Sequence, residues 1–134
     1  MNYLLDSSAL LAFYFGESGA QRVGEILADD QTNVSLSVLT AAELWSRLRA
    51  EGWEEAFDNE WRLISEAVSA VIPITLEVVL LSLPLRAAAT ARLPQIDALI
   101  AATAASQGAI LIHRDPHFTA IPAHLLRQEM LPPL

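Results

Sequence analysis

The chain opens with Met1-Asn2-Tyr3-Leu4-Leu5-Asp6-Ser7-Ser8-Ala9-Leu10-Leu11, and this stretch decides the fold class. The apolar run before Asp6 predicts a short buried strand over residues 2–6. Ser7 or Ser8 can cap a helix that starts directly afterwards and ends near Gly16. A buried strand that passes straight into a helix is typical of α/β proteins.

The same alternation continues along the chain. Gly52 and Gly108 each end a predicted helix, and Pro84 predicts a kink or break in another. Strands that alternate with helices predict a parallel sheet with helices on both faces and right-handed crossovers. A length of 134 residues suits one domain, residues 1–134. The predicted strands are 2–6, 33–37, 71–75 and 109–113, the predicted helices are 7–16, 18–29, 38–50, 53–71, 76–92 and 95–107, and the tail is expected to be irregular.

The composition indicates a globular protein without disulfides. Hydrophobic residues make up 53% of the chain and charged residues 18%, and there is no cysteine. The amino terminus lacks the basic start of a signal peptide. The longest apolar runs, 78–85 and 98–105, are too short to span a bilayer. We therefore expect a soluble cytoplasmic protein that does not bind membranes.

The charged residues argue against several classes of protein. The net charge is −8, and the eight residues counted as Lys or Arg are all arginines. An acidic surface disfavours non-specific coating of nucleic acid, which depends on neutralising phosphates. The absence of lysine and of a glycine-rich loop excludes the P-loop ATPases. It also disfavours haloacid-dehalogenase-type phosphatases and response-regulator receivers, since both normally use a lysine beside their aspartates.

Four acidic residues stand at the edges of predicted core elements. Asp6 and Asp115 directly follow predicted strands. Glu43 lies in the second turn of the helix after the second strand, and Asp97 lies in the first turn of its helix. Ligands of parallel sheets bind beyond the carboxyl ends of the strands, so these side chains are expected to face one crevice. Because buried carboxylates are costly unless paired, we expect a divalent cation to hold them together, as in metal-dependent phosphodiester hydrolysis.

Each of these acids also has a simpler interpretation. Asp6 can cap the helix that follows it. Glu43 can form an ion pair with Arg47, one turn later on the same helix. Asp97 can interact with the dipole of its helix, and Asp115 can be an ordinary turn residue.

Four short motifs, in this order, resemble those of a known family. Leu5-Asp6-Ser7-Ser8-Ala9-Leu10 is similar to its first acidic motif, and Ala42-Glu43-Leu44 is similar to its second. Leu93-Pro94-Gln95-Ile96-Asp97-Ala98-Leu99-Ile100-Ala101-Ala102-Thr103-Ala104 is close to the third and is the most specific of the four. Arg114-Asp115-Pro116-His117-Phe118 is similar to the fourth. Over essentially its whole length the chain thus resembles the PIN-domain family, and more narrowly the VapC-type ribonuclease toxins of type II toxin–antitoxin pairs.

The resemblance implies a three-layer α/β/α domain with a mainly parallel sheet of four or five strands. It also implies an endoribonuclease that depends on Mg²⁺, with Mn²⁺ as a possible substitute. Asp6 and Asp97 are then expected to bind the metal directly, and Glu43 and Asp115 complete the site directly or through water. Ser8 is expected to support the site with its hydroxyl group.

The resemblance further implies an RNA substrate, a cognate antitoxin and a homodimer. Arg114 or Arg92 is expected to hold an RNA phosphate beside the crevice, and the antitoxin is expected to place an arginine among the carboxylates. The positive mean hydropathy agrees with an apolar dimer face. That face is expected to draw on Leu11, Phe13, Tyr14 and the region 80–85.

Two other functions fit the same acids. One is a catalytically silent PIN-like module that binds a protein partner, although such a module has no need of all four carboxylates. The other is a metal-dependent phosphatase that acts on small substrates. The target RNA and the identity of an antitoxin do not follow from the sequence.

His113 stands two residues before Asp115, where the family usually has threonine or serine. Strand alternation places both side chains on one face, so the ring is expected to donate a hydrogen bond to Asp115 and orient it. Activity should then fall as the ring becomes protonated, near a pKa of about 6.5. No spacing marks His117 or His124 as a metal ligand. Three tryptophans are expected to lie in the core or at an interface: Trp45, Trp53 and Trp61.

Overall fold

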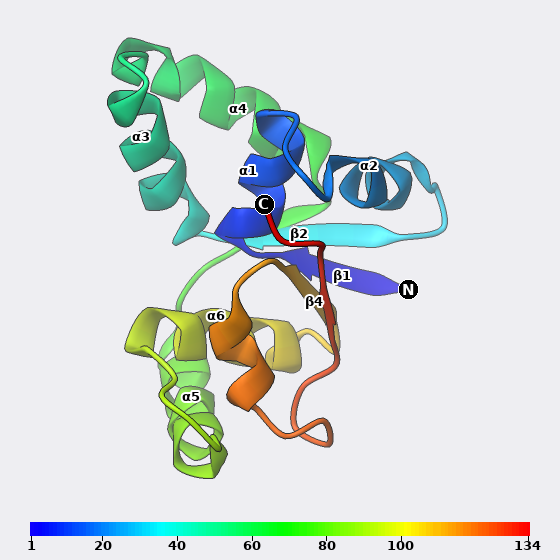
Figure 1. Ribbon diagram of the computed structural model, residues 1–134, viewed down its shortest axis with the longest axis vertical. Coiled ribbons are helices and arrows are strands. Elements are labelled where there is room, and N and C mark those ends of the chain that lie inside the picture. Colours follow the sequence, from blue (N-terminus) through cyan, green and yellow to red (C-terminus); the bar gives the residue numbers. More distant parts are fainter.

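A parallel sheet forms the middle layer of the computed structural model, which describes residues 1–134. Its strands, in spatial order, are β3 (Ala70–Ile72), β2 (Asn33–Ser37), β1 (Asn2–Leu5), β4 (Ile110–His113) and β5 (Gln128–Met130). On one side of the sheet lie α1 (Ser7–Tyr14), α2 (Ala20–Ala28), α3 (Thr40–Ala50) and α4 (Phe57–Ala67), and on the other lie α5 (Leu76–Ala88) and α6 (Gln95–Ser106) (Figure 1). Two short 3₁₀ helices complete the fold, η1 (Glu54–Ala56) and η2 (Pro116–Ala120). The predicted three-layer α/β/α architecture is confirmed.

Strand β1 is buried on both faces because it lies at the centre of the sheet. Leu4 packs in a core with residues of α5 and α6, whereas Tyr3 and Leu5 pack in a second core with residues of α1 and α2. Successive side chains of a strand point to opposite faces, so a strand between two helical layers needs a continuous apolar run. Trp61 of α4 packs against the second core, whereas Trp45 and Trp53 are exposed.

The direction of the crossovers reverses between β1 and β4. The chain runs from β1 to β2 and β3 through helices on one side, and then returns to β4 through α5 and α6 on the other. The backbone N–H of Asp6 joins the two central strands at this point by donating to the carbonyl of Ile112 (3.0 Å). A crevice beyond the carboxyl ends of β1 and β4 is the usual ligand position of such a sheet.

The tail is not irregular as predicted, because Gln128–Met130 forms strand β5. It pairs in parallel with β4, with His113 opposite Met130. The segment is short and contains two polar residues, so it has no strand-like hydrophobic pattern. The segment pairs there because β4 has no other strand on that side, so its backbone groups are available for hydrogen bonds.

Several predicted helix boundaries were also wrong. The helix predicted over 53–71 divides into η1 and α4, and α3 begins at Thr40 rather than at residue 38. The predicted break at Pro84 does not occur, since α5 continues through it to Ala88. Pro84 lies on the exposed side of α5, where water can bond the carbonyl that its missing N–H leaves free. None of the helices combines the length and apolar character needed to cross a membrane.

Candidate metal centre

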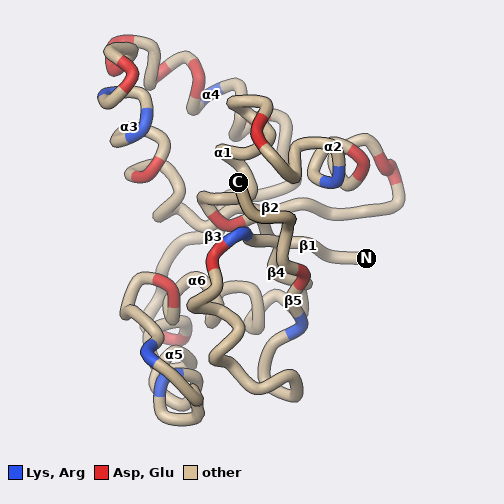
Figure 2. The backbone as a smooth tube through the Cα atoms, viewed as in Figure 1, with Lys and Arg blue, Asp and Glu red and all other residues tan.

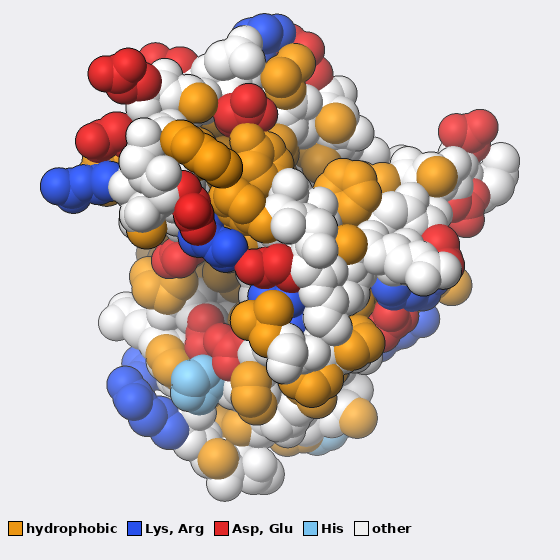
Figure 3. All heavy atoms as spheres, turned by 45° about the horizontal axis from the view of Figure 1, so that its top comes forward, with side chains coloured by type: hydrophobic (Ala, Val, Ile, Leu, Met, Phe, Trp, Pro, Cys, Tyr) orange, Lys and Arg blue, Asp and Glu red, His pale blue; other side chains and the backbone are white.

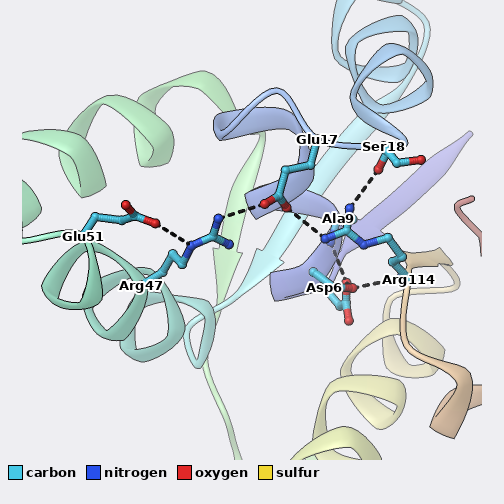
Figure 4. Close-up of polar contacts among 8 residues, drawn as sticks. Asp6, Ala9, Glu17, Ser18, Arg47, Glu51 and Arg114 are labelled. Carbon is cyan, nitrogen blue, oxygen red and sulfur yellow. Dashed lines mark hydrogen bonds and ion pairs between the residues drawn. The ribbon is translucent and has the colours of Figure 1, made fainter. Parts of the chain in front are cut away.

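Asp6 is both the N-cap of α1 and a buried acid of the crevice. Only 5% of the residue is exposed. Its Oδ1 accepts a hydrogen bond from the N–H of Ala9 (2.9 Å) (Figure 4). It also accepts one from the hydroxyl of Ser8 (2.6 Å). The predicted serine cap of α1 is therefore wrong, because Asp6 itself caps the helix. The capping contacts use one carboxylate oxygen and leave Oδ2 free to bind a cation.

Ser8 connects Asp6 to the segment that follows β4. Its hydroxyl oxygen accepts a hydrogen bond from the N–H of Arg114 (2.8 Å) while its O–H donates to Asp6. Because one hydroxyl group binds both partners, the Asp6 carboxylate is held close to the backbone of Arg114. The structure thus places Ser8 in contact with the acid that it was predicted to support.

Asp97, Asp115 and His117 lie together on the α6 side of the crevice. The Nδ1 atom of His117 is 2.9 Å from Oδ1 of Asp115 and 3.5 Å from Oδ2 of Asp97. One ligand atom from each of the three residues lies within 4.8 Å of the others. Acidic positions from separate parts of the chain meet near the strand ends in Figure 2. In the space-filling view, acidic side chains gather beside a histidine in the middle of the molecule (Figure 3).

The electrostatics of this cluster favour a bound cation. Burial raises the pKa of Asp6 to about 7, and the charges of Asp115 and Asp97 add to this effect, while the bonds from Ser8 and Ala9 oppose it. Burial and the charge of Asp115 likewise raise the pKa of Asp97. A divalent ion would relieve both the desolvation and the repulsion.

Glu43 approaches the same cluster from α3. Its charge contributes to the raised pKa of Asp97, and its side chain is exposed. The simpler interpretation, an ion pair between Glu43 and Arg47, is wrong. Arg47 binds Glu17 (2.8 Å) and Glu51 (3.5 Å) instead. Glu43 is therefore an exposed acid without an ion pair, and it is not among the residues whose ligand atoms lie within 4.8 Å of one another.

The sequence model of the PIN domain matches residues 3–123. This chain belongs to the PIN-domain family. The family predicted from the four acidic motifs is confirmed. Comparison with curated protein sequences gives no significant match.

This PIN domain resembles solved structures of toxin–antitoxin proteins over nearly its whole length. A chain of VapBC2 from Rickettsia felis, bound to a DNA fragment from its promoter, has a TM-score of 0.77 at 18% identity, with 98% of this chain and 100% of that chain covered. A chain of VapBC-1 from nontypeable Haemophilus influenzae has a TM-score of 0.72 at 21% identity, with 97% and 98% covered. VapC20 from Mycobacterium tuberculosis, a sarcin–ricin loop cleaving toxin, has a TM-score of 0.70 at 16% identity, with 97% and 99% covered. At these identities the likeness shows a common fold.

His113 of this PIN domain does not donate to Asp115 as predicted. Its Nδ1 accepts the backbone N–H of Asp115 (3.2 Å), and its Nε2 lies 2.8 Å from Oε1 of Gln128. Since the Gln128 oxygen can only accept, the proton lies on Nε2 and the ring is neutral. The ring is fully buried and its centre is 4.7 Å from that of Phe118. Burial lowers its pKa, so a loss of activity through protonation of His113 should come at a lower pH than the sequence predicts.

His117 is the site residue that the sequence interpretation missed. Pro116 starts η2 directly after Asp115, and the backbone N–H of His117 donates to Oδ1 of Asp115 (2.9 Å). This turn brings the imidazole back over the carboxylate two residues earlier. The Asp-Pro-His sequence is the only local signal for it, because the contact with Asp97 depends on the fold.

The donor set fits the divalent cation that PIN domains are expected to bind. Asp6, Asp97 and Asp115 supply carboxylate oxygens, which are the ligands preferred by Mg²⁺ and Mn²⁺. Asp6 adds a specific sign of such a site, since it is a buried acid whose Oδ2 makes no hydrogen bond. No lysine or arginine forms an ion pair with these three carboxylates. His117 is the one basic side chain that contacts Asp97 and Asp115, and a divalent ion would balance the charge of the carboxylates.

Proposed function

We propose that this protein is a metal-dependent endoribonuclease that acts as the toxin of a VapBC-like toxin–antitoxin pair. The observation that carries the proposal is the grouping of Asp97 and Asp115 with His117 at the switch point of a PIN domain, close enough to the buried Asp6 for their charges to raise its pKa. Burial and mutual repulsion make this site unfavourable without a cation. The fold shared with VapBC proteins over nearly the whole chain supports the role as a toxin.

The side chains have distinct tasks in the proposed reaction. Asp6, Asp97 and Asp115 hold the cation, and Glu43 completes the site from α3 directly or through water. When bound, Mg²⁺ or Mn²⁺ neutralises the scissile phosphate and activates the attacking water. Ser8 keeps Asp6 oriented through its bond to the Arg114 backbone.

Arg92 suits the task of holding an RNA phosphate better than Arg114 does. The side chain of Arg114 is only 11% exposed, and its guanidinium is bound to Glu17 (2.9 Å) and to the carbonyl of Ser18 (2.9 Å). Arg92 is exposed and forms no ion pair. It lines a hollow of about 250 Å³ together with His117, next to the proposed metal site.

The proposed partners are an antitoxin and a second copy of this chain. The antitoxin covers the crevice and places an arginine among carboxylates that form no ion pair with an arginine of this chain. The second copy packs on an exposed apolar face of α5, whose side chains are Leu76, Val79, Leu80 and Leu83. Both partners act with the toxin in the cytoplasm, where its RNA substrate lies.

The function is tested by incubating the purified protein with total cellular RNA and Mg²⁺ or Mn²⁺. The wild type should cut RNA, and Asp97→Asn should lose at least about a hundredfold in rate because it weakens metal binding. Asp58→Asn, an exposed acid of α4, is the control and should keep full activity. Undiminished cleavage in excess EDTA would rule out a metal-dependent nuclease. Hydrolysis of p-nitrophenyl phosphate without RNA cleavage would indicate a phosphatase, and inactivity on both would indicate a silent binding module.

A further inference from the structure

His117 is the one nitrogen donor that faces the proposed metal centre. Its Nδ1 lies 2.9 Å from Asp115 and 3.5 Å from Asp97, and its side chain is 47% exposed. The backbone N–H of the same residue is bound to Asp115. The turn at η2 thus holds the backbone of His117 beside Asp115, and the imidazole reaches both carboxylates without an ion.

We propose that His117 binds the metal ion through Nδ1, and that this mixed nitrogen and oxygen site selects Mn²⁺ over Mg²⁺. The inference rests on the metal centre of the proposed function and concerns which ion that centre prefers. It assigns a ligand outside the four carboxylates.

The distances between the donor atoms suit a single ion. With metal–ligand distances of about 2.1 Å, neighbouring ligands of an octahedral ion lie about 3.0 Å apart and opposite ligands about 4.2 Å apart. The 2.9 Å between His117 and Asp115 matches neighbouring ligands, and the 3.5 Å to Asp97 falls between the two values. The three donor atoms span less than 4.8 Å, so small side-chain rotations would place all three around one ion.

The type of ligand atom decides which metal ion the site prefers. Mg²⁺ prefers oxygen ligands and gives up its water reluctantly, whereas imidazole suits the transition metals. A site of carboxylates alone would discriminate little between Mg²⁺ and Mn²⁺. Exchange of one oxygen for the nitrogen of His117 adds affinity for Mn²⁺ without a similar gain for Mg²⁺.

A second role for His117 predicts the opposite result. In the metal-free protein the ring can donate a hydrogen bond to Asp115 and so act as its partner. If that were its only role, the ring would have to leave when an ion binds. Removal of the ring would then leave the affinity for Mn²⁺ unchanged or raise it.

The experiment measures metal binding by the full chain in the absence of RNA. Isothermal titration with MnCl₂ and MgCl₂ gives the two affinities, and pulsed EPR of the bound Mn²⁺ detects a coordinated ¹⁴N. The wild type should show ¹⁴N modulation. His117→Ala should lose that modulation and about tenfold or more in affinity for Mn²⁺, with a change in Mg²⁺ affinity of less than about threefold. His124→Ala, which removes an exposed histidine with no contact to the site, should behave like the wild type.

The outcomes separate this inference from the proposed function. Bound Mn²⁺ without ¹⁴N modulation in the wild type would overturn the role of His117, and so would unchanged or tighter Mn²⁺ binding by His117→Ala. RNA cleavage that needs a metal would in those cases leave the nuclease proposal intact. Failure of the wild type to bind either ion would overturn both.

Discussion

At the scale of single residues, Asp6 shows how one side chain can serve the fold and the site together. Its Oδ1 caps α1 through Ala9 and accepts the Ser8 hydroxyl, while Oδ2 stays unbonded. The cap stabilises the fold, but burial of the charge raises its pKa from 3.8 to about 7. In the metal-free protein, the ionised form of Asp6 is therefore destabilising.

The consequence for stability has a definite sign. The pKa of Asp6 is higher in the folded protein than in the unfolded chain. Protonation of Asp6 therefore stabilises the folded protein, and this contribution grows as the pH falls from above 7 toward 4. Asp6→Asn keeps an oxygen that can accept both hydrogen bonds and removes the charge. In EDTA it should raise Tm by about 5 °C at pH 8, by less at pH 5 and hardly at all below about pH 4.

Thermal unfolding followed by circular dichroism measures Tm at each pH. Asp58→Asn is the control, since it removes an exposed acid of α4. Addition of Mn²⁺ should raise Tm of the wild type more than that of Asp6→Asn, because the ion binds the folded state. An equal effect of Asp6→Asn at high and low pH would show that desolvation of Asp6 is not the cause.

At the scale of elements, Glu17 ties three parts of the chain together. It lies between α1 and α2, and its side chain binds Arg47 of α3 (2.8 Å) and Arg114 after β4 (2.9 Å) (Figure 4). The backbone of Arg114 is in turn bound to Ser8. The packing of α3 against α1 is thus connected to the segment that carries Asp115.

Glu17→Gln should destabilise the protein at neutral pH and not in acid. The bond from Arg47, followed by that from Arg114, lowers the pKa of Glu17. A lowered carboxyl pKa gives stability that is present above the unfolded value and is lost as the pH falls through the folded value. We expect a loss of about 1 kcal/mol in unfolding free energy at pH 7. The difference between variant and wild type should shrink below about pH 4.5, the ordinary value for glutamate.

Urea unfolding at the two pH values measures this difference. Glu66→Gln breaks the exposed pair of Glu66 with Arg62 and serves as the control, with an expected effect near zero. If Glu17→Gln were as neutral as the control at pH 7, the three-residue contact would contribute nothing to the coupling of these elements.

At the scale of the whole molecule, the two predicted parts of the dimer face differ in exposure. Leu80 and Leu83 of α5 are 54% and 56% exposed, and Leu76 is 72% exposed. Of the three residues named on α1, only Phe13 is exposed, while Leu11 and Tyr14 are half-buried. An exposed apolar stripe on one helix favours α5 as the main contact of the proposed homodimer.

The double substitution Leu80→Glu and Leu83→Glu should convert the proposed dimer to a monomer, because it places charges in the apolar contact. Light scattering after size-exclusion chromatography at micromolar concentration measures the mass. Leu63→Glu introduces the same charge at an exposed leucine of α4 and should leave the dimer intact. A wild-type protein that is already monomeric at this concentration would contradict the proposal.

The sequence by itself determined the architecture and the positions of the four acids. Apolar runs such as Tyr3–Leu5 encode buried strands through a local pattern, and alternation with helices leaves few arrangements other than a parallel sheet. In such a sheet the carboxyl ends of the strands share one edge, so Asp6 and Asp115 are brought together by topology alone. The four motifs that resemble those of PIN domains mark the same four acidic residues.

Only the tertiary structure decided the pairings between distant segments. His117 meets Asp97, Glu17 meets Arg114 and the tail joins β4 as strand β5. The role of His113 depended on Gln128, whose oxygen fixes the proton on Nε2 and leaves Nδ1 to accept from Asp115. Local patterns record which residues are buried and which backbone conformation they prefer. They do not record which donor faces which acceptor, because that depends on the packing of elements far apart in the chain.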